Sequence, residues 1–427
     1  MTIATAELAR RLSESLGADA ITSEGAQLAE HSVDGVTPAL ICTPATGEQL
    51  ADAVRICSEA EASVAPWGSG TAMILGNPPR TLDVIVKTTR LNRMIDHDHA
   101  NLTATVQSGI TLNALQVVLA PQKQCVPWDP PLPERSTVGG IVAANLNGPQ
   151  RSSYGSVRDL VIGMKVVLAS GEIVKAGGKV VKNVAGYDMC KLFTGSLGTL
   201  GIITEVTLRV APLPAHSATV VATGTLAKAM ECASQLMRTN LLPTAVYLHN
   251  PNGSASWQVA VGFDGFAESV ARQTTELMEM AQRLGLTGEV VNGEKPQCWQ
   301  AIADLSVNQD RLTYRLTVPR GALMRTISTI LDWLKTSQAP AICADVAMGT
   351  LWLAVPADQA TVGWFPRLIA LAQEQRGHAI IFAAPARLKK TIDVWGPTTP
   401  AHTLIRKIKQ EFDPAGLFNP GRFIGGL

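Results

Sequence analysis

The sequence lacks the features that mark several common classes of protein. Of its 427 residues, 36 are Lys or Arg and 35 are Asp or Glu, so the formal net charge is only +1. A general binder of nucleic acids or membrane surfaces needs a large basic excess, which this chain does not have. No run of about 18 apolar residues occurs, which is the length that a membrane-spanning helix requires. We therefore expect a globular protein without a transmembrane helix.

Cysteines are few, and none lie close together. No two are fewer than 15 positions apart among the seven: Cys42, Cys57, Cys125, Cys190, Cys232, Cys298 and Cys343. Iron–sulfur clusters and structural zinc sites usually need close pairs such as CxxC. The spacing therefore predicts buried, reduced thiols. If this protein transfers electrons, it carries no iron–sulfur cluster of its own.

The N-terminal segment 1–17 predicts an amphipathic helix. Leu8, Leu12 and Leu16 recur every four residues with charged residues between them, so they share one helix face. A signal peptide would show a continuous apolar block instead. We therefore expect a cytoplasmic protein.

Strand-like and helix-like segments alternate in the first half of the chain, which indicates an α/β arrangement. Thr46 and Gln49 form a capping box at the start of the first helix of this series. The prolines of 211–215 end the series and mark a domain boundary. The expected elements are helix 46–62, strands 63–67, 82–87 and 102–109, helix 111–120, hairpin 164–178 and strand 201–210.

The second half repeats one order of elements. Residues 218–291 and 311–384 each have the pattern βαββαβ, although their sequences do not match. Two such units side by side would form one large antiparallel sheet backed by helices. Residues 400–423 then predict a helix, with Leu404, Ile405, Ile408 and Phe412 on one side, followed by a turn-rich tail.

A glycine-rich stretch, "PWGSGTAMILG" at 66–76, follows the strand 63–67. Gly68 and Gly70 fit a dinucleotide-binding GxGxxG motif, but Met73 occupies the third glycine position. Pro78 and Pro79 prevent a regular helix after the loop. What remains is a tight turn whose backbone N–H groups can bind an anion, or an ordinary surface turn.

Two further small-residue segments favour the ligand-binding interpretation. In "STVGGIVAANLNGPQRSSYG" (136–155), Gly139 and Gly140 allow close approach of the backbone to a ligand. "GSLGTLGII" (195–203) carries three glycines. Three such segments in one domain, each beside a β-branched strand, suit a long ligand.

Four ordered motifs, "PWGSGT", "STVGG", "VKNVAGYDMCKLFTGSLGTLGIITE" and "FDPAGLFNPG", resemble those of the FAD-linked oxidases of the vanillyl-alcohol oxidase/PCMH type. Within that family, the chain is most similar to the FAD-binding E subunit of bacterial glycolate oxidase. The catalytic D subunit of the same oxidase typically has Glu at the position of Leu197 in this chain. The resemblance implies an α+β fold: a PCMH-type FAD-binding domain of two subdomains, and an α/β cap with a large antiparallel sheet of duplicated ferredoxin-like units. The implied boundaries are 1–33 (helical segment), 34–212 (FAD-binding domain), 213–390 (cap) and 391–427 (helix and tail returning to the FAD-binding domain).

The resemblance also implies which residues contact FAD. They are Pro66, Trp67, Gly68, Ser69, Gly70, Thr71, Gly76, Pro130, Ser136, Thr137, Gly139, Gly140, Asn145, Gly148, Arg151, Ser152, Tyr154, Gly198, Gly201, Ile203 and Asn419. We expect FAD to be bound non-covalently. Relatives with a histidyl linkage carry His where this chain has Thr71 and Ala72, and Cys125 lies too far before Gly139 to match a cysteinyl linkage.

The catalytic residues stay unassigned. Relatives that oxidise 2-hydroxy acids have a histidine-rich metal motif in the cap, whereas the matching segment here, 343–355, has no histidine. Asp345 and Gly349 are its only remnants. His97 and His99 are better explained as a solvated turn than as metal ligands, so we expect no metal site. Arg311, Arg315 and Arg320 could bind a substrate carboxylate.

Three functional hypotheses remain open. The first is the FAD-binding subunit of a glycolate oxidase/dehydrogenase complex that supports oxidation of glycolate to glyoxylate. Its partners would be a catalytic D-type flavoprotein and an iron–sulfur subunit that receives the electrons. Such a hetero-oligomer would be cytoplasmic or would lie at the inner face of the cell membrane through its partners. The second is a stand-alone FAD-dependent dehydrogenase of D-lactate or another 2-hydroxy acid. The third is an assembly scaffold without flavin.

Overall fold

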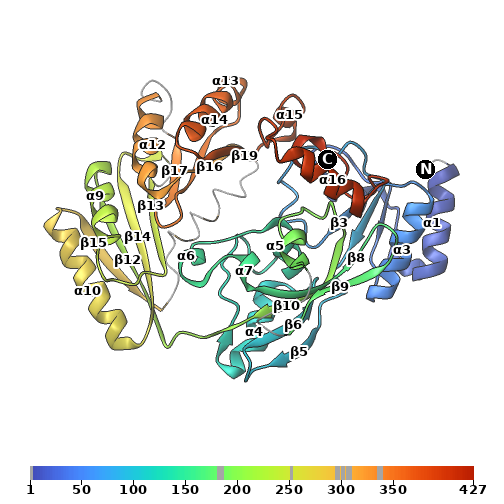
Figure 1. Cartoon of the computed structure of the whole chain (residues 1–427), viewed down its shortest axis with the longest axis horizontal. Coiled ribbons are helices and arrows are strands. Elements are labelled where there is room, and N and C mark those ends of the chain that lie inside the picture. Colours follow the sequence, from blue (N-terminus) through green and yellow to red (C-terminus); the bar gives the residue numbers. More distant parts are fainter. Residues whose placement is uncertain are drawn as a thin grey trace. The chain divides into compact units, whose positions relative to one another are not determined.

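The computed structural model describes residues 3–179, 187–250, 253–293, 299, 303, 310–333 and 340–427 (Figure 1). The chain divides into two compact units. The first unit comprises Met1–Leu146, Ser156–Pro212 and Lys389–Leu427, and the second comprises Asn147–Gly155 and Leu213–Leu388. Among the described residues, no helix is both long and apolar enough to cross a membrane.

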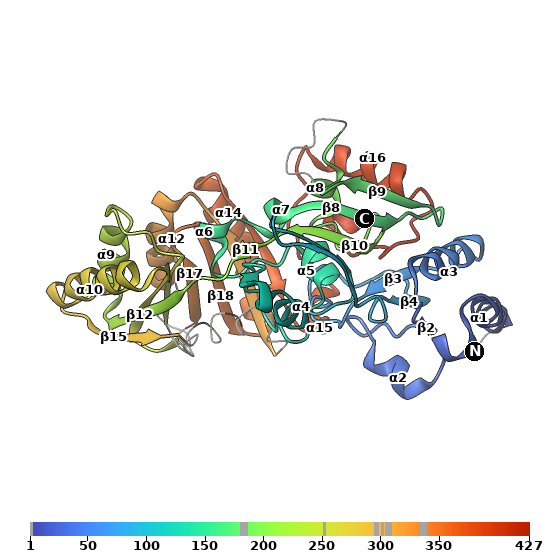
Figure 2. The same cartoon turned by 90° about the horizontal axis from the view of Figure 1, so that it is seen from below.

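A four-stranded sheet forms one layer of the first unit. Its order is β1-β2-β4-β3, and both β2 and β3 run parallel to β4. Helices α1 and α3 lie side by side next to this sheet (Figure 2). The apolar face predicted for α1 is buried, with Leu12 fully inaccessible, and Thr46 caps α3 as expected. The bounds are α1 Ile3–Leu16, β1 Ile21–Thr22, α2 Gly25–Glu30, β2 Leu40–Cys42, α3 Gly47–Glu59, β3 Val64–Trp67 and β4 Val84–Lys87.

A five-stranded antiparallel sheet forms the other layer, in the order β5-β6-β10-β8-β9. His97 lies in its edge strand β5 and contacts Gln124 Oε1 at 2.8 Å, so the turn expected around His97 is wrong. The bounds are β5 Met94–Asp98, β6 Thr103–Gln107, α4 Leu112–Leu119, β7 Gln124–Cys125, α5 Val138–Ala144, α7 Val157–Leu160, β8 Val161–Val167, β9 Ile173–Gly177, α8 Met189–Phe193, β10 Ile202–Arg209 and β11 Ala211–Pro212.

The C-terminal helix α16 (His402–Phe412) completes the first unit. Leu404, which the sequence places on its apolar side, is 62% exposed. The buried position of this helix is the charged Lys409 instead. A polar network that apolar periodicity does not show therefore holds the helix in place.

The second unit contains one eight-stranded antiparallel sheet, in the order β15-β12-β14-β13-β17-β18-β16-β19. Its two halves are the two predicted βαββαβ units, and they join through β13 and β17. This confirms the α+β class and the large cap sheet. Helices α9, α10 and α14 cover one face of this sheet (Figure 1). The bounds are α6 Arg151–Tyr154, β12 His216–Gly224, α9 Leu226–Leu236, β13 Ala245–Asn250, β14 Trp257–Gly265, α10 Ala267–Arg283, β15 Thr287–Asn292, β16 Arg311–Thr317, α12 Arg320–Trp333, β17 Ala341–Asp345, β18 Thr350–Pro356, α13 Gln359–Val362, α14 Phe365–Glu374, β19 His378–Ala383 and, at the junction with the first unit, α15 Ala386–Lys389.

Candidate functional site

A cavity in the first unit brings the three glycine-rich segments together with the C-terminal tail. The predicted cofactor residues that line it are Pro66, Trp67, Gly68, Ser69, Gly70, Thr71, Thr137, Gly139, Gly140, Gly198, Gly201, Ile203 and Asn419. The wall also includes residues that sequence reasoning missed: Ala72, Met73, Thr88, Ala143, Ala144, Leu197, Ile202 and Arg422.

The turn after β3 offers free main-chain donors to this cavity. Within the described part of the chain, the amides of residues 68–72 donate to no protein acceptor. Gly70 has φ +78°, and a Cβ there would lie 2.5 Å from the Trp67 ring, so the turn requires glycine at this position. Successive unpaired amides of this kind can bind an anion such as a phosphate.

The second segment differs from the loop that its sequence suggested. Gly139 and Gly140 lie in the first turn of helix α5, which Thr137 caps. The amide of Gly139 donates to Ser108 O at 2.7 Å, and that of Gly140 donates to Thr137 Oγ1 at 3.2 Å. These amides are therefore already engaged. The small residues here allow close approach to the cavity rather than supplying free donors.

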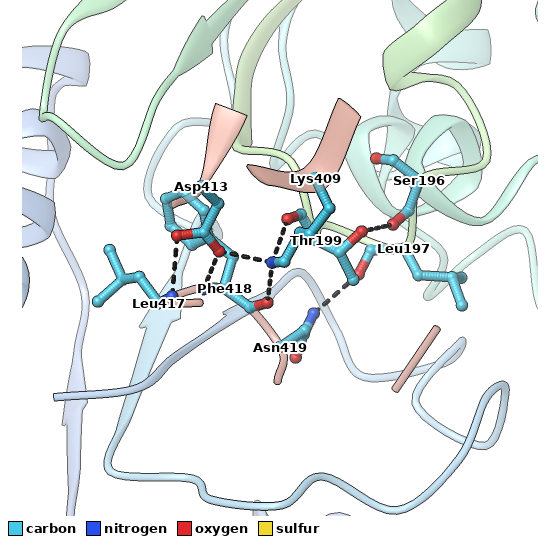
Figure 3. A network of polar contacts seen from close by, with 8 residues as sticks. All are labelled: Ser196, Leu197, Thr199, Lys409, Asp413, Leu417, Phe418 and Asn419. Atoms are coloured by element: carbon cyan, nitrogen blue, oxygen red, sulfur yellow. Dashed lines mark hydrogen bonds and ion pairs between the residues drawn. The ribbon is translucent and has the colours of Figure 1, made fainter. Parts of the chain in front are cut away.

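The tail and the third segment are locked together by a buried ion pair. Lys409 Nζ donates to Asp413 Oδ2 at 2.5 Å, to Thr199 O at 2.7 Å and to Phe418 O at 3.0 Å (Figure 3). The Asp413 carboxylate also accepts from the amides of residues 417 and 418. Asn419 Nδ2 donates to Leu197 O at 2.8 Å. The network thus fixes Asn419 and the loop around Leu197 in the cavity wall.

Two polar atoms at this wall have no partner in the described structure. They are Asn419 Oδ1 and Arg422 Nη1, and both are buried. Burial lowers the pKa of Arg422 to about 10, so its guanidinium remains charged at neutral pH. Buried polar groups are nearly always hydrogen-bonded in native proteins, so these two atoms leave hydrogen-bonding capacity at the wall that a ligand can use.

The structure does not place the other predicted cofactor residues at this cavity. Ser136 is a buried support, because its hydroxyl donates to Thr71 Oγ1 at 3.0 Å. Asn145 ends helix α5, and its side chain does not line the wall. Gly76 and Pro130 do not line it either.

Four more of the predicted residues, all within 147–155, belong to the second unit. Ser152 Oγ donates to Thr244 O at 3.1 Å, and Tyr154 OH donates to Asp264 Oδ2 at 3.1 Å. The polar side chains of this segment therefore bond to the cap sheet, which is why it groups with that sheet. Gly148 and Arg151 also belong to the second unit.

One face of the second unit's sheet carries ionisable side chains. Tyr314 stacks on Phe365 of α14, so this tyrosine lies on the helix-covered face and the next residue, Arg315, on the other. Strand pairing places His249, Cys343, Trp352 and Arg315 in one row, with Tyr247 and Asp345 in the adjacent row of the same face. The predicted segment 343–355 is the antiparallel pair β17–β18 within this face.

Burial shifts the pKa values on this face. It raises the pKa of Asp345 to about 7, although hydrogen bonds from the Met348 amide and the Tyr247 hydroxyl act in the opposite direction. It lowers the pKa of His249 to about 4. Burial and the nearby charge of Arg151 lower the pKa of Arg315 to about 10. Among the described residues, no acid forms an ion pair with Arg315, whose Nε is unpaired.

The described residues contain no group of three His, Cys, Asp or Glu side chains arranged for a metal ion. Residues 180–186 of the motif "VKNVAGYDMCKLF", as well as Cys298, lie outside the described residues.

Comparisons with known proteins agree with this architecture. Residues 38–177 match the family model of the FAD binding domain, and residues 397–423 match that of the C-terminal domain of FAD-linked oxidases. Glycolate oxidase subunit GlcE of Escherichia coli (strain K12) is 30% identical over 374 residues, which cover 84% of this chain and 92% of that protein. The chain belongs to the FAD-linked oxidases of the PCMH/VAO type.

Two further proteins match this FAD-linked oxidase in part of the sequence or in fold. Glycolate oxidase subunit GlcD of Bacillus subtilis (strain 168) is 36% identical over 217 residues, but these span only 50% of this chain and 46% of that protein. The structure of p-cresol methylhydroxylase with substrate bound has a TM-score of 0.76 and 16% identity, and covers 99% of this chain and 97% of that one. At that identity the likeness shows the fold alone.

The cavity of this FAD-linked oxidase fits FAD by its own chemistry. The unpaired amides of 68–72 suit the pyrophosphate, which accepts hydrogen bonds and donates none. Asn419 Oδ1 needs a donor and Arg422 Nη1 needs an acceptor, and the flavin ring offers both. The residues that would hold FAD are therefore the turn 68–72, the first turn of α5, the loop 197–203 and the C-terminal turn 419–422.

Proposed function

We propose that this chain is the FAD-binding subunit of a complex that oxidises glycolate to glyoxylate and passes electrons to an iron–sulfur partner. The observation that carries the proposal is the likeness to GlcE, which extends through both units of this chain and nearly the whole length of that protein. Bound flavin would accept a hydride equivalent from the substrate carbon. In this proposal FAD is held without a covalent bond.

The cavity supports this role through what its residues do. Residues 68–72 offer amides to the pyrophosphate, and the buried Lys409–Asp413 pair holds the tail against the loop at Leu197. The described cysteines form no disulfide with one another, and most of them are buried. In this proposal the cluster that takes electrons from the flavin therefore belongs to a partner chain.

Anaerobic mixing with glycolate tests the proposal. The purified chain should contain flavin that glycolate does not bleach when the chain is alone. Bleaching should occur after a D-type flavoprotein and an iron–sulfur subunit are added and co-purify with it. Absence of any stable complex with those two proteins would refute the assignment.

A second candidate, a stand-alone dehydrogenase of 2-hydroxy acids, has a specific observation in its favour. Arg315 is a guanidinium without a carboxylate partner among the described residues, and it shares a sheet face with Asp345. An unpaired guanidinium suits a substrate carboxylate. A carboxyl group with a pKa of about 7 suits proton transfer from a hydroxyl at neutral pH.

Substitution of Arg315 separates the two candidates. If the chain acts alone, glycolate or D-lactate bleaches the isolated flavoprotein, and Arg315→Met weakens that reaction at least a hundredfold through KM. Arg325→Met is the matched control, because Arg325 is an exposed residue of α12 and should leave the reaction unchanged. No bleaching of the isolated wild-type protein by either acid would exclude a stand-alone dehydrogenase of glycolate or D-lactate.

A further inference from the structure

We propose that the C-terminal turn Asn419–Arg422 binds the pyrimidine edge of the flavin ring and that Arg422 stabilises the negative charge of the reduced ring. The inference rests on FAD binding by the first unit. It does not depend on which substrate reduces the flavin or on which proteins are partners.

Arg422 is buried at the cavity wall, where it is only 3% exposed. Its Nη2 donates to two carbonyl oxygens of the preceding wall segment, Leu75 O at 2.6 Å and Met73 O at 3.0 Å. Its Nη1 has no acceptor in the described structure. One half of the guanidinium therefore anchors the wall, while the other half keeps a charged donor available.

No protein carboxylate neutralises this charge among the described residues. Asp34 is the acid whose charge acts on Arg422, but Asp34 is already paired with Lys389 at 3.1 Å, and both of those side chains are buried. The three groups together leave one net positive charge. A buried cation without a counter-ion is unfavourable, so a ligand that brings negative charge would stabilise this site.

Asn419 argues against the pyrophosphate as the part of FAD that lies here. Its Nδ2 donates to Leu197 O at 2.8 Å, which fixes the orientation of the amide and leaves Oδ1 as an acceptor without a donor. A pyrophosphate has only acceptors, so Oδ1 would repel it. The pyrimidine edge of a flavin instead has an N3–H donor next to the C2 carbonyl. This edge therefore matches the acceptor Asn419 Oδ1 and the cationic donor Arg422 Nη1.

The two side chains are held in a fixed relation. They belong to one turn, in which the Arg422 amide donates to Asn419 O at 3.2 Å. The Arg422 carbonyl accepts from the Asn77 amide at 3.1 Å and from Trp395 Nε1 at 3.0 Å. The backbone of the turn is therefore set by the protein before the cofactor binds.

The chemical consequence follows from charge balance. When a flavin takes up two electrons and one proton at N5, it gains one negative charge, centred on N1 and the C2 carbonyl. A guanidinium beside that edge in a low-dielectric wall stabilises the reduced form more than the oxidised form. Arg422 should therefore raise the reduction potential of bound FAD.

The test compares Arg422→Gln and Arg422→Lys with the wild-type protein. Glutamine can still donate to the wall carbonyls but has no charge, whereas lysine keeps the charge. The reduced-to-oxidised ratio of bound FAD, measured against a reference dye at equilibrium, should fall at least tenfold in Arg422→Gln. It should return to within about threefold of the wild-type ratio in Arg422→Lys, because one charge is retained.

Two controls distinguish an effect of the Arg422 charge on the flavin from a purely structural role of Arg422. The double variant Asp34→Asn/Lys389→Gln removes the neighbouring anchor, in which Lys389 donates to Ile74 O at 2.5 Å, without changing the net charge. It should leave the flavin ratio unchanged. An equal fall in this double variant would overturn the proposal. It would also be overturned if Arg422→Gln weakened ADP binding as much as FAD binding while the flavin ratio stayed constant.

A measurement on the wild-type protein decides the matter if Arg422→Gln does not fold. FAD labelled with carbon-13 at C2 can be bound and its carbonyl stretch recorded by infrared difference spectroscopy. A hydrogen bond from the guanidinium should lower that frequency relative to FAD in an aprotic solvent. An unshifted band would overturn the proposal while leaving FAD binding itself intact.

Discussion

The two units of this molecule differ in the kind of group that they present for binding: main-chain amides in the first unit and ionisable side chains in the second. The wall of the cavity in the first unit depends on main-chain geometry, with unpaired amides at 68–72 and a glycine at φ +78°. The face of the cap sheet opposite α14 instead presents ionisable side chains, because Asp345, His249 and Arg315 lie on it with pKa values shifted by burial. In the functions proposed above, the first arrangement binds the FAD cofactor, and in the second candidate function the side chains of the cap face bind the substrate.

Gly70→Val tests the main-chain half of this comparison and should have the largest effect. A valine there would need a left-handed backbone and would place its Cβ 2.5 Å from the Trp67 ring. We expect affinity for FAD to fall at least a hundredfold, with loss of the absorption band near roughly 450 nm. Gly47→Ala is the control, since a Cβ at Gly47 meets nothing within 4 Å. Full flavin content in Gly70→Val would contradict the role assigned to this turn.

The main-chain features were largely predictable from sequence, and the side-chain features were not. Glycine and β-branched patterns gave the turn at 68–72, the strands around it and the doubled βαββαβ order. These patterns could not predict the burial of Arg422 or Lys409, because a charged residue in a tail or on a helix is normally exposed. They also misplaced Leu404, since the α16 helix buries a charged network instead.

The segment 147–155 shows a second physical limit. Its polar residues follow a glycine-rich stretch that lines the cavity, so sequence continuity favoured one common site. The polar groups of the segment instead bond to the cap sheet through Thr244 O and Asp264. Which strand a hydroxyl reaches depends on tertiary packing, which local pattern does not encode. The row that includes His249, Cys343 and Trp352 has the same origin, because strand register alone brings these residues together.

Lys409→Met tests whether the main-chain wall depends on its buried ion pair. The variant would leave Asp413, whose side chain is fully inaccessible, without its cation. Breaking a buried pair costs about 3–5 kcal/mol of unfolding free energy, and chemical denaturation should show a loss of this size. Arg55→Met, which breaks the exposed pair with Asp52, should cost less than about 1 kcal/mol. Equal effects of the two variants would show that the network in Figure 3 does not stabilise the wall.

Asp345→Asn tests the side-chain half through pH and should have the smallest effect. A raised pKa means that the folded state holds the Asp345 proton more tightly than the unfolded state, whose reference pKa is 3.8. Stability from this group is therefore full below about pH 4 and is lost as pH rises toward about 7. The loss is at most about 1.4 kcal/mol per pH unit, and the asparagine variant should lack it.

Denaturation curves between pH 5 and pH 7 measure this difference between variant and wild type. Asp98→Asn is the control, because hydrogen bonds from Asn101 lower the pKa of that carboxyl and keep it ionised throughout the range. If the unfolding free energies of Asp345→Asn and the wild-type protein fall in parallel as pH rises, the pKa of Asp345 is not raised in the folded protein. The role proposed for this face in the second candidate function would then depend on Arg315 without an acid of raised pKa beside it.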